Sequence, residues 1–317
     1  MKSNSMENIK KEKIAVSRKV TIDSIFKYFF MTICVLCAAI IILIVAFIII
    51  KGVQPFFKEY LIKDKTYRLS FKEFLFGNKW NFAPNHYGAG FIIINTIYIT
   101  ILALIVAVPT SVLSALFIVR IAPKQIGKIL QTVIELLASV PSIVYGLFGQ
   151  AYLTKIVMQI SDVLGIQTLG GQAVITTSLV LGIMIFPTIA MVSINSIRAV
   201  KNDLVLGSLA LGASKTQTNF KVVLTASKNG IFSGIILGIG RALGEATAVS
   251  KVCGNAQVGP SFSLFDTTST ITTTILSGFS ESSGLAYDVK FSLGVVLIII
   301  IMGTNLILNY IKRKVEN

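Results

Sequence analysis

Two ionisable residues, Arg241 and Glu245, stand four positions apart in the otherwise uncharged stretch 230–250. Residues four apart on a helix are neighbours, so the carboxylate can neutralise the guanidinium, although the order Arg before Glu is the less favourable one. The guanidinium also offers a planar fork of donors that suits the oxygens of an anion. The pair is therefore either a structural ion pair or part of an anion site.

The composition of the whole chain indicates the environment of this pair. Of the 317 residues, 54% are hydrophobic and 14% are charged, whereas soluble domains average roughly 45 to 50% apolar and about 25% charged residues. An excess of this size cannot be buried in one water-soluble core, which excludes soluble enzymes and disordered chains. The chain is predicted to be an integral membrane protein.

Uncharged or nearly uncharged runs occur at lengths that cross a bilayer, for which a helix needs about 20 residues. They do not alternate in polarity as the strands of a membrane barrel do. The predicted fold class is therefore all-α integral membrane, with six transmembrane helices. The six spans are 28–50, 91–119, 129–153, 172–194, 230–250 and 291–311.

The distribution of basic residues predicts the orientation. With the N-terminus placed inside, the inner segments hold 18 Lys and Arg in 77 residues, and the outer segments hold 10 in 98. Basic residues are enriched on the cytoplasmic side of membrane proteins. We expect a bacterial inner-membrane protein with both termini in the cytoplasm. The net charge of +15 then reflects topology and contact with membrane lipid, not nucleic acid.

Three parts are expected along the chain. Residues 1–27 form a charged cytoplasmic tail ordered near the bilayer, and residues 28–87 form an N-terminal transmembrane helix with an external loop. Residues 88–317 form a five-helix core, with a long cytoplasmic loop at 200–229. Pro141 and two other prolines fall inside spans, where packing and curvature explain them. The Thr- and Ser-rich stretch 267–282 is predicted to be a short re-entrant or surface helix.

The position of Arg241 in its span makes its charge costly. If this span begins at Gly230, Arg241 lies eleven residues in, or about 16 Å at 1.5 Å per residue. A charge near the bilayer centre costs roughly 2.5 to 3.5 kcal/mol, so it needs a partner or a purpose. Glycine pairs at spacing four on the same span predict that another helix approaches its backbone closely.

The cytoplasmic segment 204–224 reads as a helix, a glycine turn and a second helix. Gly212 follows an apolar helical run and is placed to end it. Ser214 has Gln217 three positions on, which is the pattern of a capping box. The apolar residues of such an exposed pair need a partner to cover them.

This segment resembles the coupling loop of ABC importer permeases, whose pattern is E-A-A, three residues, G, nine residues, then I-x-L-P. Leu206 stands where glutamate is usual and Thr225 where proline is usual, but the glycine and the spacing are kept. The resemblance implies that this loop meets an ATPase. The residues implied are Leu206, Gly207, Ser208, Gly212, Ser214, Val222 and Leu224.

Two further strings, ELLASVPSIVYGLFG (135–149) and GIILGIGRALGEATAV (234–249), resemble phosphate-importer permeases of the PstC type. That family implies a type I importer permease fold and a phosphate importer driven by ATP. Its partners are a sister permease of the PstA type, two ATPases of the PstB type and an external binding protein of the PstS type. The family's transport-linked arginine and glutamate match Arg241 and Glu245, so Arg241 would contact phosphate while Glu245 holds the arginine in an empty path.

The residues independently exclude one role. No G-x-x-x-x-G-K-S or -T loop occurs, so the chain has no phosphate cradle of that type for ATP. We expect a non-catalytic permease subunit without a cofactor or metal of its own, with ATP on the partner ATPase. A permease for sulfate or molybdate, a secondary anion transporter and a membrane sensor remain alternatives.

Glu135 is placed at the headgroup level near Lys128, where a carboxylate costs little, with gating as the alternative. The external loops around Trp80 and 267–282 are expected to meet the binding protein. Cys34, Cys37 and Cys253 are interpreted as packing residues.

Overall fold

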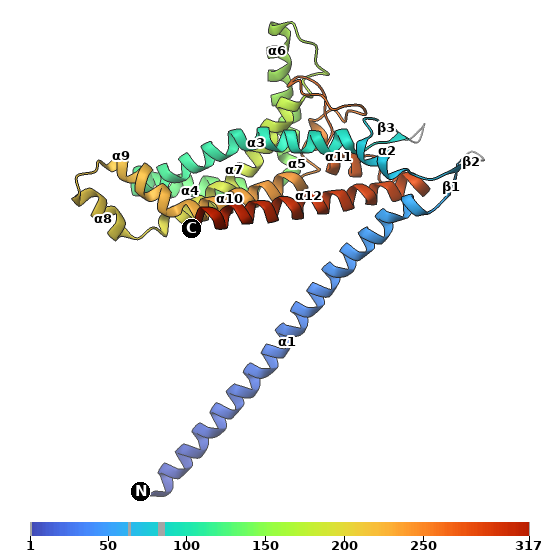
Figure 1. Cartoon of the computed structure of the whole chain (residues 1–317). Coiled ribbons are helices and arrows are strands. Elements are labelled where there is room, and N and C mark those ends of the chain that lie inside the picture. The colour runs from blue at the N-terminus through green and yellow to red at the C-terminus, as the bar shows by residue number, and fades with distance from the viewer. Residues whose placement is uncertain (1, 63–64, 82–85, 317) are drawn as a thin grey trace. The chain divides into compact units, whose positions relative to one another are not determined.

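In this computed structural model, the backbone is described for residues 2–62, 65–81 and 86–316, and the side chains for 23–62, 66–81 and 86–314. The chain divides into two units, residues 1–51 and 52–317, each of which is described by itself. Figure 1 shows the elements of both units.

The first unit is a single helix. Helix α1 (Lys2–Phe57) begins in this unit and its last turns belong to the second. The tail 1–27, predicted to be ordered only near the bilayer, is therefore helical from Lys2 onward. The stretch Asp23–Phe57 is long and apolar enough to span a membrane, and none of its most apolar window is buried within the chain.

The second unit is built on four long helices: α3 (Gly90–Leu116), α7 (Val174–Arg198), α10 (Leu224–Gly244) and α12 (Gly284–Glu316). Helix α7 is the central one, with 67% of its most apolar window buried. Buried side chains such as Ile99 and Ile185 join α3 to α7. Together with α1, five of the six predicted spans are single helices in the described part of the chain.

The remaining span, predicted as one helix over 129–153, is broken. It consists of α4 (Lys124–Ser139), α5 (Ser142–Phe148), the π-helix η2 (Gly149–Leu153) and α6 (Thr154–Leu164), with a bend of 96°. The break falls at Val140, which is extended (φ −66°, ψ 128°) because the proline that follows disfavours helical geometry there. Figure 1 shows α6 projecting away from the four long helices.

Pro109 and Pro187 lie inside α3 and α7 without breaking them. These two helices pack against each other along their lengths, and the Ser111 hydroxyl donates to the Phe186 carbonyl at 3.0 Å, one residue before Pro187. Neighbouring helices and hydroxyls compensate for proline in membrane helices. The break at Pro141 is therefore larger than the curvature expected for the three prolines.

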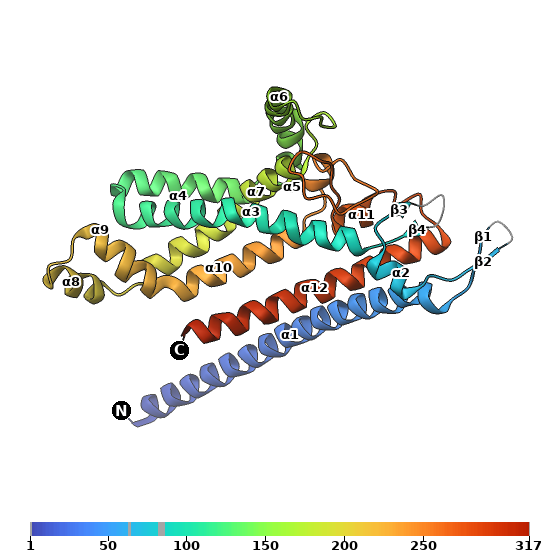
Figure 2. The same ribbon diagram turned by 45° about the horizontal axis from the view of Figure 1, so that its top comes forward.

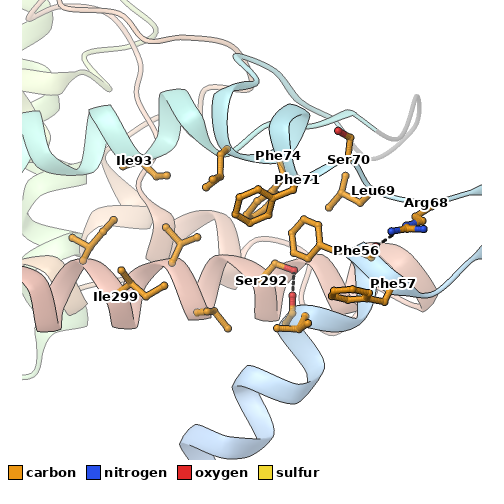
Figure 3. Close-up of a pocket in the computed structure, with 16 residues that line it drawn as sticks. Phe56, Phe57, Arg68, Leu69, Ser70, Phe71, Phe74, Ile93, Ser292 and Ile299 are labelled. Atoms are coloured by element: carbon orange, nitrogen blue, oxygen red, sulfur yellow. Dashed lines mark hydrogen bonds between the residues drawn. The ribbon is translucent and has the colours of Figure 1, made fainter.

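Residues 52–90 form a small subdomain at one end of the bundle. It holds two antiparallel pairs, β1 (Tyr60–Ile62) with β2 (Lys65–Tyr67) and β3 (Trp80–Asn81) with β4 (His86–Tyr87), and helix α2 (Phe71–Phe76). Buried rings fill its core. Beside it lies an apolar hollow of about 960 Å³, where Figure 3 shows the rings of Phe56, Phe71 and Phe74 facing Ile299 of α12.

A polar contact fastens this subdomain to α12. The Tyr60 hydroxyl donates to the buried Asp288 carboxylate at 2.7 Å. Burial, reinforced by that carboxylate, raises the pKa of Tyr60 well above its usual range, so the phenol remains a donor across the physiological pH range.

The Thr- and Ser-rich stretch 267–282 contains a short helix, as predicted. Helix α11 (Ile271–Leu276) begins with a capping box between Thr270 and Thr273. Residues 268–274 are buried within the chain, and so is Trp80. The exposed part of these loops is therefore limited to their neighbours, such as residues 276–278 and 78–79, and contact with a binding protein stays a prediction.

The opposite end of the bundle carries α8 (Asn202–Ala210), α9 (Lys215–Gln217) and the π-helix η3 (Thr218–Val223). Figures 1 and 2 both show α8 and α9 at the end away from the β-strands. From Lys215 to Gly244 the helical path is continuous through α9, η3 and α10. The predicted fifth span, 230–250, therefore begins earlier and ends earlier than expected.

Candidate functional site

Arg241 and Glu245 do not share a helix. Helix α10 ends at Gly244, and Glu245 is extended with φ −77° and ψ 122°. The predicted pairing of residues four apart on one helix is therefore wrong, since the backbone leaves helical geometry between them. Among the described side chains, no carboxylate lies within ion-pair distance of Arg241.

Arg241 is held by a neutral group. Its Nη1 donates to Thr188 Oγ1 of α7 at 2.7 Å. The guanidinium sits in the last turn of α10, where the partial negative charge of the free carbonyls favours a cation. The charge is thus oriented by a hydroxyl and favoured by a helix end, and no carboxylate neutralises it within the described part of the chain.

The guanidinium borders a hollow of about 640 Å³ between α7, α10 and α12. Polar side chains share the wall with apolar ones, and Lys312 Nζ donates to Ser233 Oγ at 2.9 Å at this site. The lining residues are Thr188, Ser233, Ile236, Leu237, Gly240, Arg241, Asn305 and Asn309.

Sequence reasoning missed the polar residues of this wall other than Arg241. Asn305 and Asn309 stand four apart in the apolar span 291–311. Polar side chains inside a membrane helix are costly and are commonly functional. That spacing is the signal that could have identified them.

Glu245 shapes the backbone after α10. Its Oε1 accepts from the Ala248 N–H at 2.9 Å and from Thr247 Oγ1 at 2.8 Å, while its carbonyl accepts from Thr272 Oγ1 of α11 at 2.6 Å. This carboxylate caps the turn that leads into η4 (Val249–Lys251), as acidic side chains do at helix starts. Its expected role of holding Arg241 is not supported by these contacts.

The break after α10 meets the break after α4. Ser142 Oγ lies 2.7 Å from Thr247 Oγ1, and the Tyr145 hydroxyl donates across its own break to the Leu137 carbonyl at 2.7 Å. Non-helical backbone at membrane depth is tolerated only where protein buries it or water lines it. Two broken helices and α11 therefore converge beside the Arg241 turn.

The glycine pairs on α10 have different surroundings. A Cβ on Gly238 would lie 2.7 Å from Ile189 of α7, so the glycine permits the close approach of α7, as predicted for this pair. A Cβ on Gly240 or Gly244 would meet nothing within 4 Å. Here the prediction of close packing fails within this chain, and Gly240 instead borders the hollow.

The turn of the predicted coupling loop is built by local rules. Gly212 adopts φ +87°, the left-handed conformation that glycine adopts without steric cost. Its N–H donates to the Leu209 carbonyl at 3.0 Å, and the Ala213 N–H donates to the Ser208 carbonyl at 3.2 Å. These bonds form a Schellman motif, so the predicted helix stop at Gly212 is confirmed.

The second helix begins at the predicted capping box. The Gln217 N–H donates to Ser214 Oγ at 3.2 Å, and the Ser214 N–H donates to Gln217 Oε1 at 2.9 Å. Ser208 Oγ and Thr218 Oγ1 lie 3.0 Å apart and link α8 to η3. The loop thus has a defined angle between its two helices.

The two sides of this loop differ in exposure. On the inner side, Val205 of α8 is buried. On the outer side, Leu206 and Leu211 are 63% and 91% exposed. Gly207 is also exposed, while Val222 and Leu224 are half-buried, with Leu224 against the interior. The apolar outer side presents a surface that can bind a partner.

Glu135 is exposed on α4, and its Oε1 accepts from Gln131 Nε2 at 2.8 Å. Cys253 is buried, in keeping with a packing residue, whereas Cys34 and Cys37 are exposed on α1.

Comparison with known proteins adds a family context. Residues 107–317 match the family described as "Binding-protein-dependent transport system inner membrane component". The "Probable ABC transporter permease protein YqgH" of Bacillus subtilis is 34% identical over 278 residues, 86% of this chain and 85% of that protein. The "Phosphate transport system permease protein PstC" of Pasteurella multocida is 36% identical over 241 residues, 72% of this chain and 75% of that one.

Among solved structures, a chain of a bacterial ABC transporter involved in the import of the acidic polysaccharide alginate matches with a TM-score of 0.54 at 17% identity. The match covers 72% of this chain and 79% of that chain. The similarity confirms the predicted permease fold and, at this identity, shows the fold alone.

Proposed function

Because the chain belongs to the family of binding-protein-dependent transport system inner membrane components, we propose that it is a permease subunit of an ATP-driven importer of inorganic phosphate. Several spanning helices place it in a membrane. Relatives named as phosphate permeases support the choice of substrate.

One observation carries the proposal within the structure. Arg241 is a membrane-helix cation that faces a hollow of about 640 Å³, and among the described side chains no carboxylate neutralises it. An anion that enters the hollow meets a guanidinium fork together with amide and hydroxyl groups. Arg241 is therefore the proposed phosphate contact, and Glu245 holds the broken backbone that borders the path.

The coupling end supports the need for an ATPase partner. The Gly212 turn and the Ser214 cap fix α8 and α9, and exposed Leu206 and Leu211 offer an apolar contact. We propose that this surface docks one ATPase subunit of a pair, where ATP is bound and hydrolysed. A sister permease completes the path and an external binding protein delivers phosphate.

The orientation follows from charge. The end with α8 and α9 is the end to which the sequence assigns the dense Lys and Arg segments, so it is the proposed cytoplasmic side. Both termini lie on that side in the proposal.

The test is uptake of radiolabelled phosphate by cells that carry Arg241→Gln in place of the native chain. Loss of a charged partner for a desolvated anion costs several kcal/mol, so the initial uptake rate is expected to fall on the order of 100-fold. Arg241→Lys keeps the charge but loses the fork of donors, so its uptake rate should lie between those of the native chain and of Arg241→Gln. Co-purification of the ATPase checks assembly.

Sulfate and molybdate are tested as competitors, at tenfold excess over radiolabelled phosphate, in cells that carry the native chain. Only unlabelled phosphate should suppress the uptake of radiolabelled phosphate. If the assembled Arg241→Gln variant takes up phosphate normally, Arg241 is not the phosphate contact. If sulfate or molybdate competes more strongly than unlabelled phosphate, that anion is the substrate instead.

A further inference from the structure

A third hollow lies at the end of the bundle that carries the coupling loop. It measures about 260 Å³ and lies where η1 (Phe117–Ile121) turns into α4 beside the end of α7. Figure 2 shows this turn at the same end as α8 and α9. The lining residues are Ile118, Val119, Ala122, Lys124, Gly127, Lys128, Gln131 and Arg198.

Three cations converge on this small volume. Lys124 and Lys128 lie one turn apart on α4, and Arg198 reaches the hollow from the last turn of α7. Within the described side chains, none of the three has a carboxylate within ion-pair distance. All three side chains are exposed, and two separate elements bring them to one hollow.

The neighbouring hydrogen bonds orient the arginine without neutralising it. Arg198 Nη2 donates to Gln131 Oε1 at 2.8 Å, and Gln131 Nε2 donates in turn to Glu135 Oε1 at 2.8 Å. The amide stands between the two charges, so the guanidinium keeps other donors for a ligand. An amide in this place holds the arginine over the hollow and keeps the carboxylate one turn away.

Apolar residues also line the hollow. Ile118 and Val119 line it, and the nearby Ile126 and Ile129 on α4 are 48% and 63% exposed. A ligand that suits both parts has an anionic head of phosphate size and an apolar remainder. Basic pockets between membrane helices on the cytoplasmic side bind lipid head groups in this way.

We propose that Lys124, Lys128 and Arg198 form a binding site for a phosphate group at the cytoplasmic end of this chain, separate from the Arg241 hollow. The group is supplied by the head of an anionic phospholipid or by free inorganic phosphate, since both present the same oxygens. The assignment to the cytoplasmic side rests on the proposed orientation, but binding itself does not depend on transport.

The test uses the purified full-length chain in detergent. Native mass spectrometry measures retention of phosphatidylglycerol and of phosphatidylcholine, which has the same phosphodiester without net charge, and equilibrium dialysis measures radiolabelled inorganic phosphate. The triple variant Lys124→Gln, Lys128→Gln, Arg198→Gln should lower the apparent affinity for phosphatidylglycerol about tenfold or more. Phosphatidylcholine should bind weakly to all variants.

Two controls separate the hollow from general charge. The triple variant Lys201→Gln, Arg313→Gln, Lys314→Gln removes as much charge at the same end from residues that do not line the hollow and should bind phosphatidylglycerol normally. Ala122→Leu keeps every charge but narrows the hollow, and should weaken binding.

The outcomes distinguish the sources. Loss confined to phosphatidylglycerol assigns the site to lipid, and loss of inorganic phosphate binding in the first triple variant but not in the second assigns it to free phosphate. Equal binding by both triple variants, or full binding by Ala122→Leu, overturns the proposal. Failure of phosphate uptake by the intact transporter would bear on the proposed function only.

Discussion

The continuous helix Lys215–Gly244 connects two regions that are built differently. At its start, the coupling turn is held by bonds between residues three to ten positions apart, such as Ser214 with Gln217 and Ser208 with Thr218. At its end, besides the local cap of Glu245, Arg241 and its neighbours bond to residues 27 to 105 positions away, in α7, α11 and α5.

This difference has a physical consequence. A local motif forms wherever its residues occur, because the partners are already near one another along the chain. The junction at the end of α10 forms only when four separate segments pack together. The first region can therefore move as a unit against a partner, while the second depends on the packed bundle around it.

Among substitutions that alter the hydrogen bonds or backbone of the two regions and leave Arg241 in place, the largest expected effect comes from the coupling turn. Gly212→Val places a β-branched residue at φ +87°, which costs roughly 1 to 2 kcal/mol and opens the turn. ATP-driven phosphate uptake should fall at least about tenfold, while Arg241 stays in place. The measurements are uptake and co-purification of the ATPase.

Gly165→Val is the matched control, because Gly165 also has a positive φ (+69°), at the end of α6, with nothing within 4 Å of a Cβ. It should carry the same strain without loss of coupling. Equal loss in both variants would mean that strain in general, not the coupling turn, limits transport.

A smaller effect is expected at the other end of the helix. Thr188→Val keeps the side-chain shape but removes the acceptor of Arg241 Nη1. The lost bond to a charged group is worth about 1.5 kcal/mol, so KM for phosphate uptake should rise roughly tenfold, with normal assembly.

Thr110→Val makes the same replacement on α3, where the hydroxyl bonds only to carbonyls of its own helix. Its uptake kinetics should match those of the native chain. If Thr188→Val also behaves as native, the arginine is oriented by something other than this hydroxyl.

Two substitutions of Glu245 distinguish its role as a hydrogen-bond cap from the effect of its charge. Glu245→Gln keeps an oxygen for the Ala248 N–H, and Glu245→Ala removes it. Loss of a cap costs about 1 kcal/mol, so only the alanine variant should lower the thermal unfolding temperature of the purified protein. Equal destabilisation by both substitutions would assign the stabilisation to charge.

The smallest effect is expected from Ser214→Ala, which removes the cap at the start of α9. Loss of about 1 kcal/mol should speed amide hydrogen exchange at residues 215–218 by roughly fivefold, while exchange near Ala248 stays unchanged. A change at both ends would show that the two regions are coupled through the helix.

Much of the membrane architecture could be predicted because span length and charge asymmetry are properties of short runs of sequence. Five of the six spans are single helices at roughly the expected places in the described chain. The remaining span, predicted over 129–153, is broken at Pro141, and residue type alone does not distinguish this proline from Pro109 and Pro187. Whether a proline bends or breaks a helix depends on the neighbouring elements, which the sequence does not display.

The same division applies to the sites. By itself the sequence determined the helix stop at Gly212, the cap at Ser214 and an arginine in an apolar stretch, because each depends on residues within one or two turns. Only the tertiary structure decided that Arg241 bonds Thr188 and faces Asn305, and that Glu245 caps a turn instead of pairing with it. The partners of Arg241 lie far apart in sequence, and only the packing of α7, α10 and α12 brings them together. The cap at Glu245 is local, but it forms because α10 ends at Gly244.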